Sequence, residues 1–237
     1  MNRGFLYGDG FFETIRVIDG QIPLVLFHID RIEDALEIYD MTAQFEITSE
    51  FIKGMVHESQ QNGILRINFF RDGGGKYLGE SDLVAFNHTF NEYNEPFFLP
   101  ISLDLEADLT KAPKSIGTWA MYSEPKPNVS WMTVKSLSSM YYVLAAKQKM
   151  KLGTDYLFIQ NDKKEICEEL VSNLLLQIGD EIIIPARSSG GIIGSTLRYL
   201  LATYGFQLTE RIVTLEDIEN ANSVYCCKGS TGVTRIK

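Results

Sequence analysis

Residues 3–20 read RGFLYGDGFFETIRVIDG, and this stretch sets the pattern for the first half of the chain. Residues 11–18 are rich in β-branched and aromatic side chains, which favours a strand. Asp19-Gly20 comes next, a dipeptide typical of a two-residue hairpin turn, and residues 21–26 supply a second candidate strand. The stretch therefore predicts a β-hairpin near the N-terminus.

Outward from this hairpin, the first half alternates helices and strands. Apolar residues recur every three to four positions over residues 28–39, and a second helix is expected over residues 49–61. A strand over 65–71 and two further β-rich runs, near 83–89 and 98–104, follow. We expect a small α/β domain here.

The second half has a different rhythm, and a polar stretch over residues 106–114 is the best candidate for a linker before it. A helix over residues 136–151 is followed by strands, by a helix that ends near residue 204, and by a short acidic helix. The expected strands are 156–160, 171–177, 181–184, 207–213 and 223–227. The sequence thus predicts a two-domain α/β (α+β) protein, with a smaller domain over residues 1–107 and a larger one over residues 108–237.

Composition excludes several classes of protein. Of the 237 residues, 45% are hydrophobic and 22% charged, which is ordinary for a globular protein. The formal net charge is −9 and no Lys/Arg-rich run is present, so we expect no nucleic-acid partner. No apolar run approaches the roughly 18 residues of a membrane span, and the N-terminus lacks a secretory pattern. We therefore expect a cytoplasmic protein without a membrane partner.

Cysteines and histidines do not form a metal-ligand pattern. The three histidines are scattered singly, and the three cysteines form no even framework. Cys226 and Cys227 are adjacent, and neighbouring residues of a strand face opposite sides, so packed thiols are expected rather than a bridge. No metal site is predicted.

Two glycine-rich segments are candidates for phosphate sites. Gly73-Gly74-Gly75-Lys76 resembles a phosphate loop, but Tyr77 stands where that motif needs Ser or Thr, so a turn between strands is favoured. Residues 190–196 instead open a helix, where free backbone N–H groups and the helix dipole favour an anion. The segment is not part of a strand-GxGxxG-helix unit with an acidic residue about 20 positions later, so a dinucleotide-binding fingerprint is not supported.

Single polar residues carry little information by themselves. Most lysines are solvated, although Lys135 follows an apolar stretch and precedes a predicted helix, where desolvation would favour a reactive amine. Glu168, Glu169 and Arg31 are equally ordinary when taken alone. Their order along the chain is what distinguishes them.

That order resembles the fold-type IV pyridoxal-phosphate enzymes, the class IV aminotransferase family. Six ordered motifs carry the resemblance over nearly the whole chain: residues 3–16, 26–31 (LFHIDR), 71–75 (RDGGG), 134–136 (VKS), 168–173 (EELVSN) and 191–198 (GIIGSTLR). The resemblance implies the two-domain fold of D-amino-acid aminotransferase-like enzymes and pyridoxal 5'-phosphate as cofactor, bound by the larger domain.

The resemblance also implies roles for individual residues. Lys135 would form the Schiff base with the cofactor and then move protons at the substrate carbon. Glu168 would pair with the pyridine nitrogen and keep it protonated. Arg31 would grip the phosphate through its guanidinium fork. Asn173, five residues after Glu168, belongs to the same cofactor-binding motif.

Phosphate contacts are also implied at two loops. Backbone N–H groups of Thr196 and Leu197 match the helix-start donors, although Ser195 and Leu197 depart from the usual glycine, Ile or Val, threonine, arginine run. In relatives a Thr or Ser stands near the position of Gly229 or Cys227. Here the backbone amide of Gly229 or the hydroxyl of Ser230 would take its place.

The motifs favour the lyase branch of the family. Transaminases often carry a tyrosine five residues after the lysine, and Met140 stands there. The arginine and histidine that hold the substrate carboxylate in D-amino-acid aminotransferases align with Lys76 and Leu78. A lyase similar to 4-amino-4-deoxychorismate lyase, which makes 4-aminobenzoate and pyruvate for folate synthesis, is thus favoured. A branched-chain or D-amino-acid aminotransferase, and a non-catalytic relative, are the alternatives.

Substrate and partners follow from the same resemblance. A small-molecule amine substrate and a homodimer are expected, and the candidates for contacts with the substrate are Phe12, Thr14, Arg16, Arg71 and Lys76. Relatives usually continue with a further strand and a C-terminal helix beyond the last phosphate loop. We expect the larger domain to lack both.

Overall fold

The computed structural model describes residues 2–237 and divides them into two compact units. The first contains the chain up to Glu95 together with Val134–Ser139, and the second contains Pro96–Thr133 and Met140–Lys237. The division therefore falls at residues 95 and 96, where the sequence suggested 107 and 108. In addition, the short segment Val134–Ser139, which carries Lys135, returns to the first unit.

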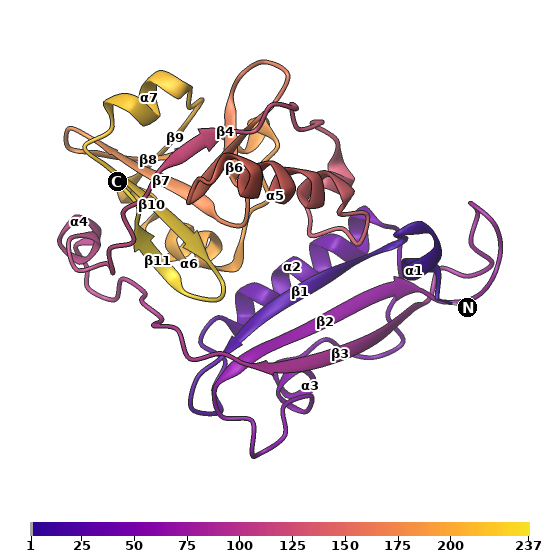
Figure 1. Ribbon diagram of the computed structural model, residues 1–237. Coiled ribbons are helices and arrows are strands. Elements are labelled where there is room, and N and C mark those ends of the chain that lie inside the picture. The colour runs from indigo at the N-terminus through magenta and orange to yellow at the C-terminus, as the bar shows by residue number, and fades with distance from the viewer. Residues whose placement is uncertain (1) are drawn as a thin grey trace. The chain divides into compact units, whose positions relative to one another are not determined.

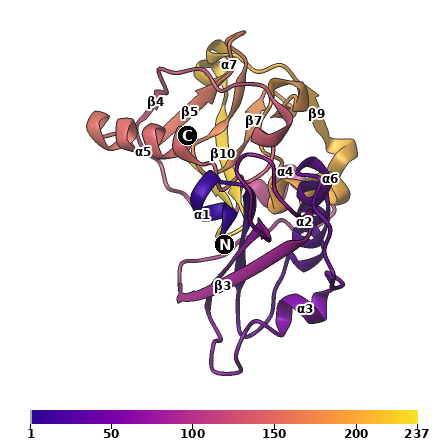
Figure 2. The same cartoon turned by 90° about the vertical axis from the view of Figure 1, so that its right-hand side faces the viewer.

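The first unit is a three-stranded antiparallel sheet, ordered β1-β2-β3. Its elements are α1 (Arg3–Tyr7), β1 (Gly10–Val17), α2 (Val25–Ile38), α3 (Ser49–Lys53), β2 (Gly63–Arg71) and β3 (Val84–Glu92). Helices α2 and α3 lie on the same side of this sheet (Figures 1 and 2). They bury Ile32 and Ile52 against Ile15, Leu65 and Ile67, which alternate along β1 and β2 as one apolar face.

The prediction of an N-terminal hairpin is correct for its turn but wrong for its second strand. Asp19 and Gly20 do adopt the positive φ values of a tight turn, but only Ile18 and Gln21 pair across it. Pro23 has no N–H for a ladder, and the chain enters α2 at Val25. The partner of β1 is β2 instead, and Ile15 faces Leu65 in their register. The helix expected over 49–61 is also shorter and ends at Lys53.

The second unit holds a five-stranded sheet, ordered β11-β10-β7-β8-β9, and a three-stranded sheet, ordered β4-β5-β6 (Figure 1). Its strands are β4 (Trp119–Met121), β5 (Tyr156–Gln160), β6 (Ile166–Glu169), β7 (Asn173–Ile178), β8 (Glu181–Pro185), β9 (Leu208–Arg211), β10 (Ser223–Lys228) and β11 (Gly232–Arg235). Its helices are α4 (Leu105–Leu109), α5 (Met140–Leu152), α6 (Ser195–Tyr204) and α7 (Leu215–Asn220), with short 3-10 turns at Ser130–Met132, Arg187–Ser189 and Gly205–Gln207.

The stretch taken as a linker is part of this unit. Residues 105–109 form α4, which Asp104 caps by accepting a hydrogen bond from the Ala107 N–H. Leu105 and Leu109 lie one turn apart and are buried in the core beside Leu175 and Leu200. This apolar spacing outweighs the polar composition that suggested a linker.

Alternation along the five-stranded sheet builds two cores. Cys227 packs on one face with α6, through Leu197 and Leu200, whereas Cys226 packs on the other with Ile218 of α7. Both thiols are buried and free, which confirms the prediction of packed cysteines. Among the described residues, no helix is long and apolar enough to cross a membrane.

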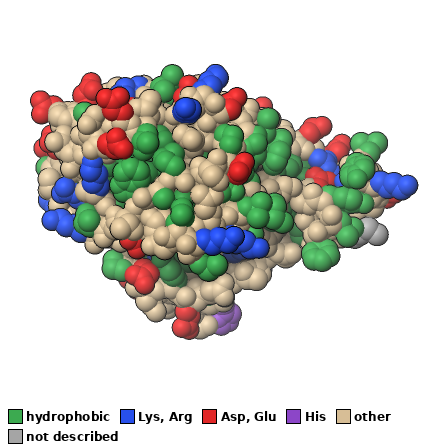
Figure 3. Space-filling model, turned by 45° about the horizontal axis from the view of Figure 1, so that its top comes forward, with side chains coloured by type: hydrophobic (Ala, Val, Ile, Leu, Met, Phe, Trp, Pro, Cys, Tyr) green, Lys and Arg blue, Asp and Glu red, His purple; other side chains and the backbone are tan. Residues whose placement is uncertain are grey.

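Charged side chains are dispersed over the surface that Figure 3 presents. Lysine and arginine lie among acidic and apolar side chains on that face, and no broad basic field is visible there. This distribution agrees with the formal net charge of −9.

Candidate active site

Lys135 lies on an extended segment along the edge of the first sheet. Its carbonyl accepts a hydrogen bond from the Phe12 N–H at 2.8 Å, and the Leu137 N–H donates to the Gly10 carbonyl at 2.9 Å. Because the backbone of this segment pairs with β1, α5 begins only at Met140, four residues later than the sequence suggested. The half-buried Lys135 side chain places Nζ 5.2 Å from the centroid of the Phe12 ring.

A cluster of buried charged side chains lies on the face of β1 opposite the Phe12 side chain. Glu13 is 2% exposed; its Oε2 lies 2.7 Å from Nδ1 of His28 and its Oε1 lies 3.0 Å from a guanidinium nitrogen of Arg31. His28 and Arg31 lie three residues apart in α2, so both side chains face the strand. The cluster thus holds Arg31 within the first unit, and its contact with phosphate stays a prediction.

Electrostatics decide the charges within this cluster. Burial alone would raise the pKa of Glu13, but Arg31, the His28 hydrogen bond and the Lys135 charge outweigh it and lower that pKa. Burial lowers the pKa of His28 despite its bond to Glu13, so the imidazole is favoured in its neutral form. The charge of Lys135 acts on both groups, which places the expected anchor in the same electrostatic environment as Arg31.

Arg66 is a candidate that sequence reasoning missed. It faces Thr14 in the β1–β2 register, and its guanidinium lies 3.8 Å from the centroid of the same Phe12 ring that Lys135 approaches. Nε donates to Asn68 at 2.9 Å, while among residues 2–237 the terminal nitrogens have no hydrogen-bond partner. A cation within the apolar run of residues 65–70 was the available signal, because alternation places it on the sheet face opposite the core.

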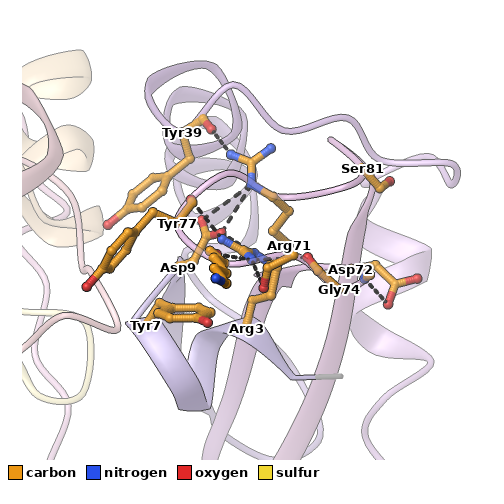
Figure 4. A network of polar contacts seen from close by, with 12 residues as sticks. Arg3, Tyr7, Asp9, Tyr39, Arg71, Asp72, Gly74, Tyr77 and Ser81 are labelled. Carbon is orange, nitrogen blue, oxygen red and sulfur yellow. Dashed lines mark hydrogen bonds and ion pairs between the residues drawn. The ribbon is translucent and has the colours of Figure 1, made fainter.

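The arginines that the sequence proposed for the substrate hold the backbone of their own unit. Arg16 donates to the carbonyls of Tyr93 and Glu95. Arg71 reaches Asp9 at 3.2 Å and the Tyr39 carbonyl at 2.6 Å (Figure 4). It also reaches Asp82 at 2.7 Å.

The loop after Arg71 is held in the same way. Arg3, which is buried, donates to the carbonyls of Gly74 and Lys76. These hydrogen bonds stabilise the loop that was predicted to be a turn between strands. The Lys76 side chain is exposed. Roles in substrate binding for Arg16, Arg71 and Lys76 therefore stay predictions.

In the second unit, Glu168 is buried at the end of β6 with three donors. Oε1 accepts from Lys126 Nζ at 2.7 Å and from the Tyr142 hydroxyl at 2.8 Å, and Oε2 accepts from the Ile192 N–H at 2.9 Å. Its neighbour Glu169 accepts instead from the Val171 N–H and the Ser172 hydroxyl, so it stabilises the turn between β6 and β7. The two adjacent carboxylates therefore lie in different environments.

Asn173 fixes the segment that leads into α6. Its amide oxygen accepts from the Gly194 N–H at 2.9 Å, and its amide nitrogen donates to the Ile192 carbonyl at 2.5 Å. Gly194 has no room for a side chain, because a Cβ there would lie 2.7 Å from the Asn173 oxygen. Asn173 and Glu168 therefore hold the same short segment at the start of the helix.

The start of α6 presents hydrogen-bonding groups without protein partners. Gly194 at the N-cap offers no side-chain cap, and among the described residues the buried hydroxyls of Ser195 and Thr196 have no hydrogen-bond partner. Buried hydroxyls are normally satisfied, and a helix N-terminus favours an anion. The arrangement fits a phosphate group, with the first N–H groups of the helix, including that of Leu197, as further donors.

The second loop has the same property one residue later than expected. Gly229 and Ser230 lie in the turn between β10 and β11, and the buried hydroxyl of the next residue, Thr231, has no partner within the described part of the chain. The sequence pattern indicated Gly229 and Ser230, and Thr231 is a further candidate that it did not single out. These donors, together with Glu168, fit the phosphate and the ring nitrogen of pyridoxal phosphate. Within residues 2–237, no group of three or more His, Cys, Asp or Glu side chains could hold a metal ion.

Known proteins resemble the chain over nearly its full length. The family model for amino-transferase class IV matches residues 10–237. Aminodeoxychorismate lyase of Bacillus subtilis is 26% identical over 236 residues, which cover 94% of this chain and 75% of the relative. A putative branched-chain-amino-acid aminotransferase of Methanocaldococcus jannaschii is 25% identical over 227 residues, which cover 94% of this chain and 76% of the relative.

Among solved structures, a putative 4-amino-4-deoxychorismate lyase from Legionella pneumophila superposes with a TM-score of 0.81 at 18% identity, covering 99% of this chain and 84% of the other. This likeness confirms the fold of the type IV enzymes that the motifs predicted. Pyridoxal phosphate is the cofactor of the family, as expected. The chain belongs to the class IV aminotransferases and is a pyridoxal-phosphate-dependent transferase or lyase.

Proposed function

We propose that the chain is a lyase that converts 4-amino-4-deoxychorismate to 4-aminobenzoate and pyruvate. The observation that carries this proposal is the position five residues after Lys135, where transaminases often place a tyrosine. Met140 stands there with its side chain 65% exposed, and the hydroxyl of nearby Tyr142 is bonded to Glu168. The likeness to the lyase of Bacillus subtilis supports the same assignment.

The roles of the chain's own residues follow from their positions. Pyridoxal phosphate, when bound, withdraws electrons from the substrate carbon that bears the amine. Nζ of Lys135 would take the proton from that carbon, and the C–O bond to the enolpyruvyl group would break as the ring becomes aromatic. The leaving enolate would gain a proton at its methylene carbon and depart as pyruvate.

Glu168 and the loop hydroxyls would hold the cofactor. Glu168 would meet the ring nitrogen, while Ser195, Thr196 and Thr231 offer the unpaired buried hydroxyls for the phosphate. Arg31 would add a guanidinium to the phosphate, as the family resemblance implies.

The reaction is decided by the products. Purified protein given 4-amino-4-deoxychorismate should release pyruvate and 4-aminobenzoate in equal amounts, as measured by a coupled dehydrogenase assay and by chromatography. Exchange of amino groups between amino acids and 2-oxoglutarate without release of pyruvate would replace the lyase with an aminotransferase, the second candidate that the archaeal relative supports. Absence of both reactions and of bound cofactor would indicate a non-catalytic relative.

Arg66 is expected to bind a carboxylate of the substrate. Replacing it with methionine should raise KM about 10- to 100-fold with a much smaller change in kcat, because a charged hydrogen bond to the substrate is lost while Lys135 stays in place. Steady-state kinetics of Arg66→Met and of Lys53→Met, a change at an exposed position of the same unit, provide the comparison. An equal rise in KM for both variants would refute a specific role for Arg66.

The same proposal includes a homodimer in the cytoplasm that serves folate synthesis. Support for the dimer comes from α5, where Met140, Val143, Leu144 and Met150 are each at least 44% exposed and would be covered by a second copy. Light scattering of the purified protein measures the mass directly.

A further inference from the structure

Lys126 is a lysine with no exposure, which is rare unless the charge has a partner. It follows β4, and its N–H donates to the Gln160 carbonyl at 2.8 Å, so its backbone continues the pairing of β4 with β5. This pairing fixes the direction of the side chain. Neither the motifs nor the proposed catalytic steps use Lys126.

The ammonium of Lys126 ends on Glu168. Nζ lies 2.7 Å from Oε1, and the Tyr142 hydroxyl donates to the same oxygen at 2.8 Å. Lys126 Nζ also lies 5.6 Å from the centroid of the Tyr142 ring, so the three side chains form one compact group. Burial, followed by the charge of Glu168, raises the pKa of Tyr142 well above its ordinary value, which keeps the phenol a donor.

The hydrogen-bond donors around Glu168 leave one acceptor site of its carboxylate unfilled. A carboxylate accepts roughly four hydrogen bonds. Lys126 and Tyr142 fill Oε1, and the Ile192 N–H takes one site on Oε2, so one site on Oε2 remains. The remaining site lies on the oxygen that is bonded to the segment leading into α6, where the unpaired hydroxyls of Ser195 and Thr196 lie.

Burial of this ion pair also needs a reason. Replacing a buried ion pair with apolar side chains of similar size is often neutral or stabilising, so stability alone does not explain the pair. A role in cofactor binding does explain the pair. The Glu168 carboxylate has to accept a hydrogen bond from a cationic N–H, and Lys126 orients this carboxylate and balances its charge.

We propose that Lys126 and Tyr142 are positioning residues that act through Glu168, by fixing its carboxylate so that Oε2 is presented to the protonated ring nitrogen of pyridoxal phosphate. This inference rests on the proposed function, in which Glu168 meets that nitrogen. Neither residue touches the reacting atoms.

Cofactor affinity tests the inference without relying on activity. Apo protein is titrated with pyridoxal phosphate and followed by its visible absorbance over a range of pH. Lys126→Met should weaken binding about 10- to 100-fold, as loss of an outer partner does for other bound groups, and should move the absorbance maximum or its pH midpoint. Tyr142→Phe, which removes one hydrogen bond, should weaken binding about 2- to 10-fold. Lys163→Met removes a lysine from an exposed position and should match the wild type.

The double variant Lys126→Met with Glu168→Gln separates positioning from a general effect on the fold. If Lys126 acts through Glu168, the double variant should bind no more weakly than Glu168→Gln alone. Losses of affinity that simply add would overturn the inference, as would a folded Lys126→Met protein with the affinity and spectrum of the wild type. If Lys126→Met fails to fold, wild-type affinity in Tyr142→Phe overturns it instead. A wild-type protein that binds no cofactor would refute the proposed function itself.

Discussion

Lys135→Ala is expected to abolish the visible absorbance of the cofactor-loaded protein and to lower turnover by at least about 10²–10⁴-fold. The loss is large because one amine serves both as the covalent anchor and as the group that moves the proton. Absorbance scans before and after borohydride reduction, with the mass of the reduced protein, measure the covalent attachment. A reduced adduct of unchanged yield in Lys135→Ala would refute the assignment.

The geometry of the segment makes this variant a clean test. Lys135 pairs with β1 through its backbone carbonyl, which accepts from the Phe12 N–H at 2.8 Å, so alanine keeps the bond. The side chain is only half-buried and contributes little to the apolar core. Circular dichroism should therefore match that of the wild type, and Lys163→Ala, at an exposed position, controls for the lost charge.

One motif predicted the start of α6 correctly, whereas periodicity misplaced the start of α5. The glycine-rich run before α6 predicted a helix start with open donors, because a helix N-terminus has this property wherever it occurs. Only the start of the helix expected from Ser136 was wrong, because residues 136 and 137 lie on the segment that pairs with β1, more than a hundred positions earlier. Local patterns contain no information about such a partner.

The same reason explains the residues that were missed. Lys126 meets Glu168 across 42 positions, and nothing in the sequence around Lys126 distinguishes it from a surface lysine. Arg66 is visible as a cation in an apolar run, but only the register with β1 places it beside Phe12. The motifs identified residues by type and order, whereas pairing across the fold identifies their partners.

Glu13→Gln is expected to lower the free energy of unfolding by about 3–5 kcal/mol, since removing one member of a buried ion pair leaves the other charge uncompensated. The Glu13 side chain is 2% exposed and Arg31, its partner at 3.0 Å, is 7% exposed, so water cannot replace the lost contact. Urea unfolding measures the change. Glu33→Gln, at an exposed position of α2, should change the free energy of unfolding by less than about 0.5 kcal/mol. Equal effects of the two variants would contradict a special role for the cluster.

The pH dependence of unfolding provides an independent measure of the same cluster. Burial lowers the pKa of His28 in the folded chain, so as the pH falls below about 6.5 the unfolded chain takes up a proton that the folded chain does not, and stability falls. Glu13 adds to the loss of stability at lower pH. Its pKa is lowered in the folded chain, so its stabilising contribution is complete only above the ordinary pKa of a glutamate and is lost as the pH falls below it. As the pH falls below about 6.5, the slope due to His28 can reach at most about 1.4 kcal/mol per pH unit. His28→Gln should flatten this slope, whereas His57→Gln, at an exposed position, should leave it unchanged. A slope that survives unchanged in His28→Gln would mean that other groups cause the pH dependence and would contradict its assignment to His28.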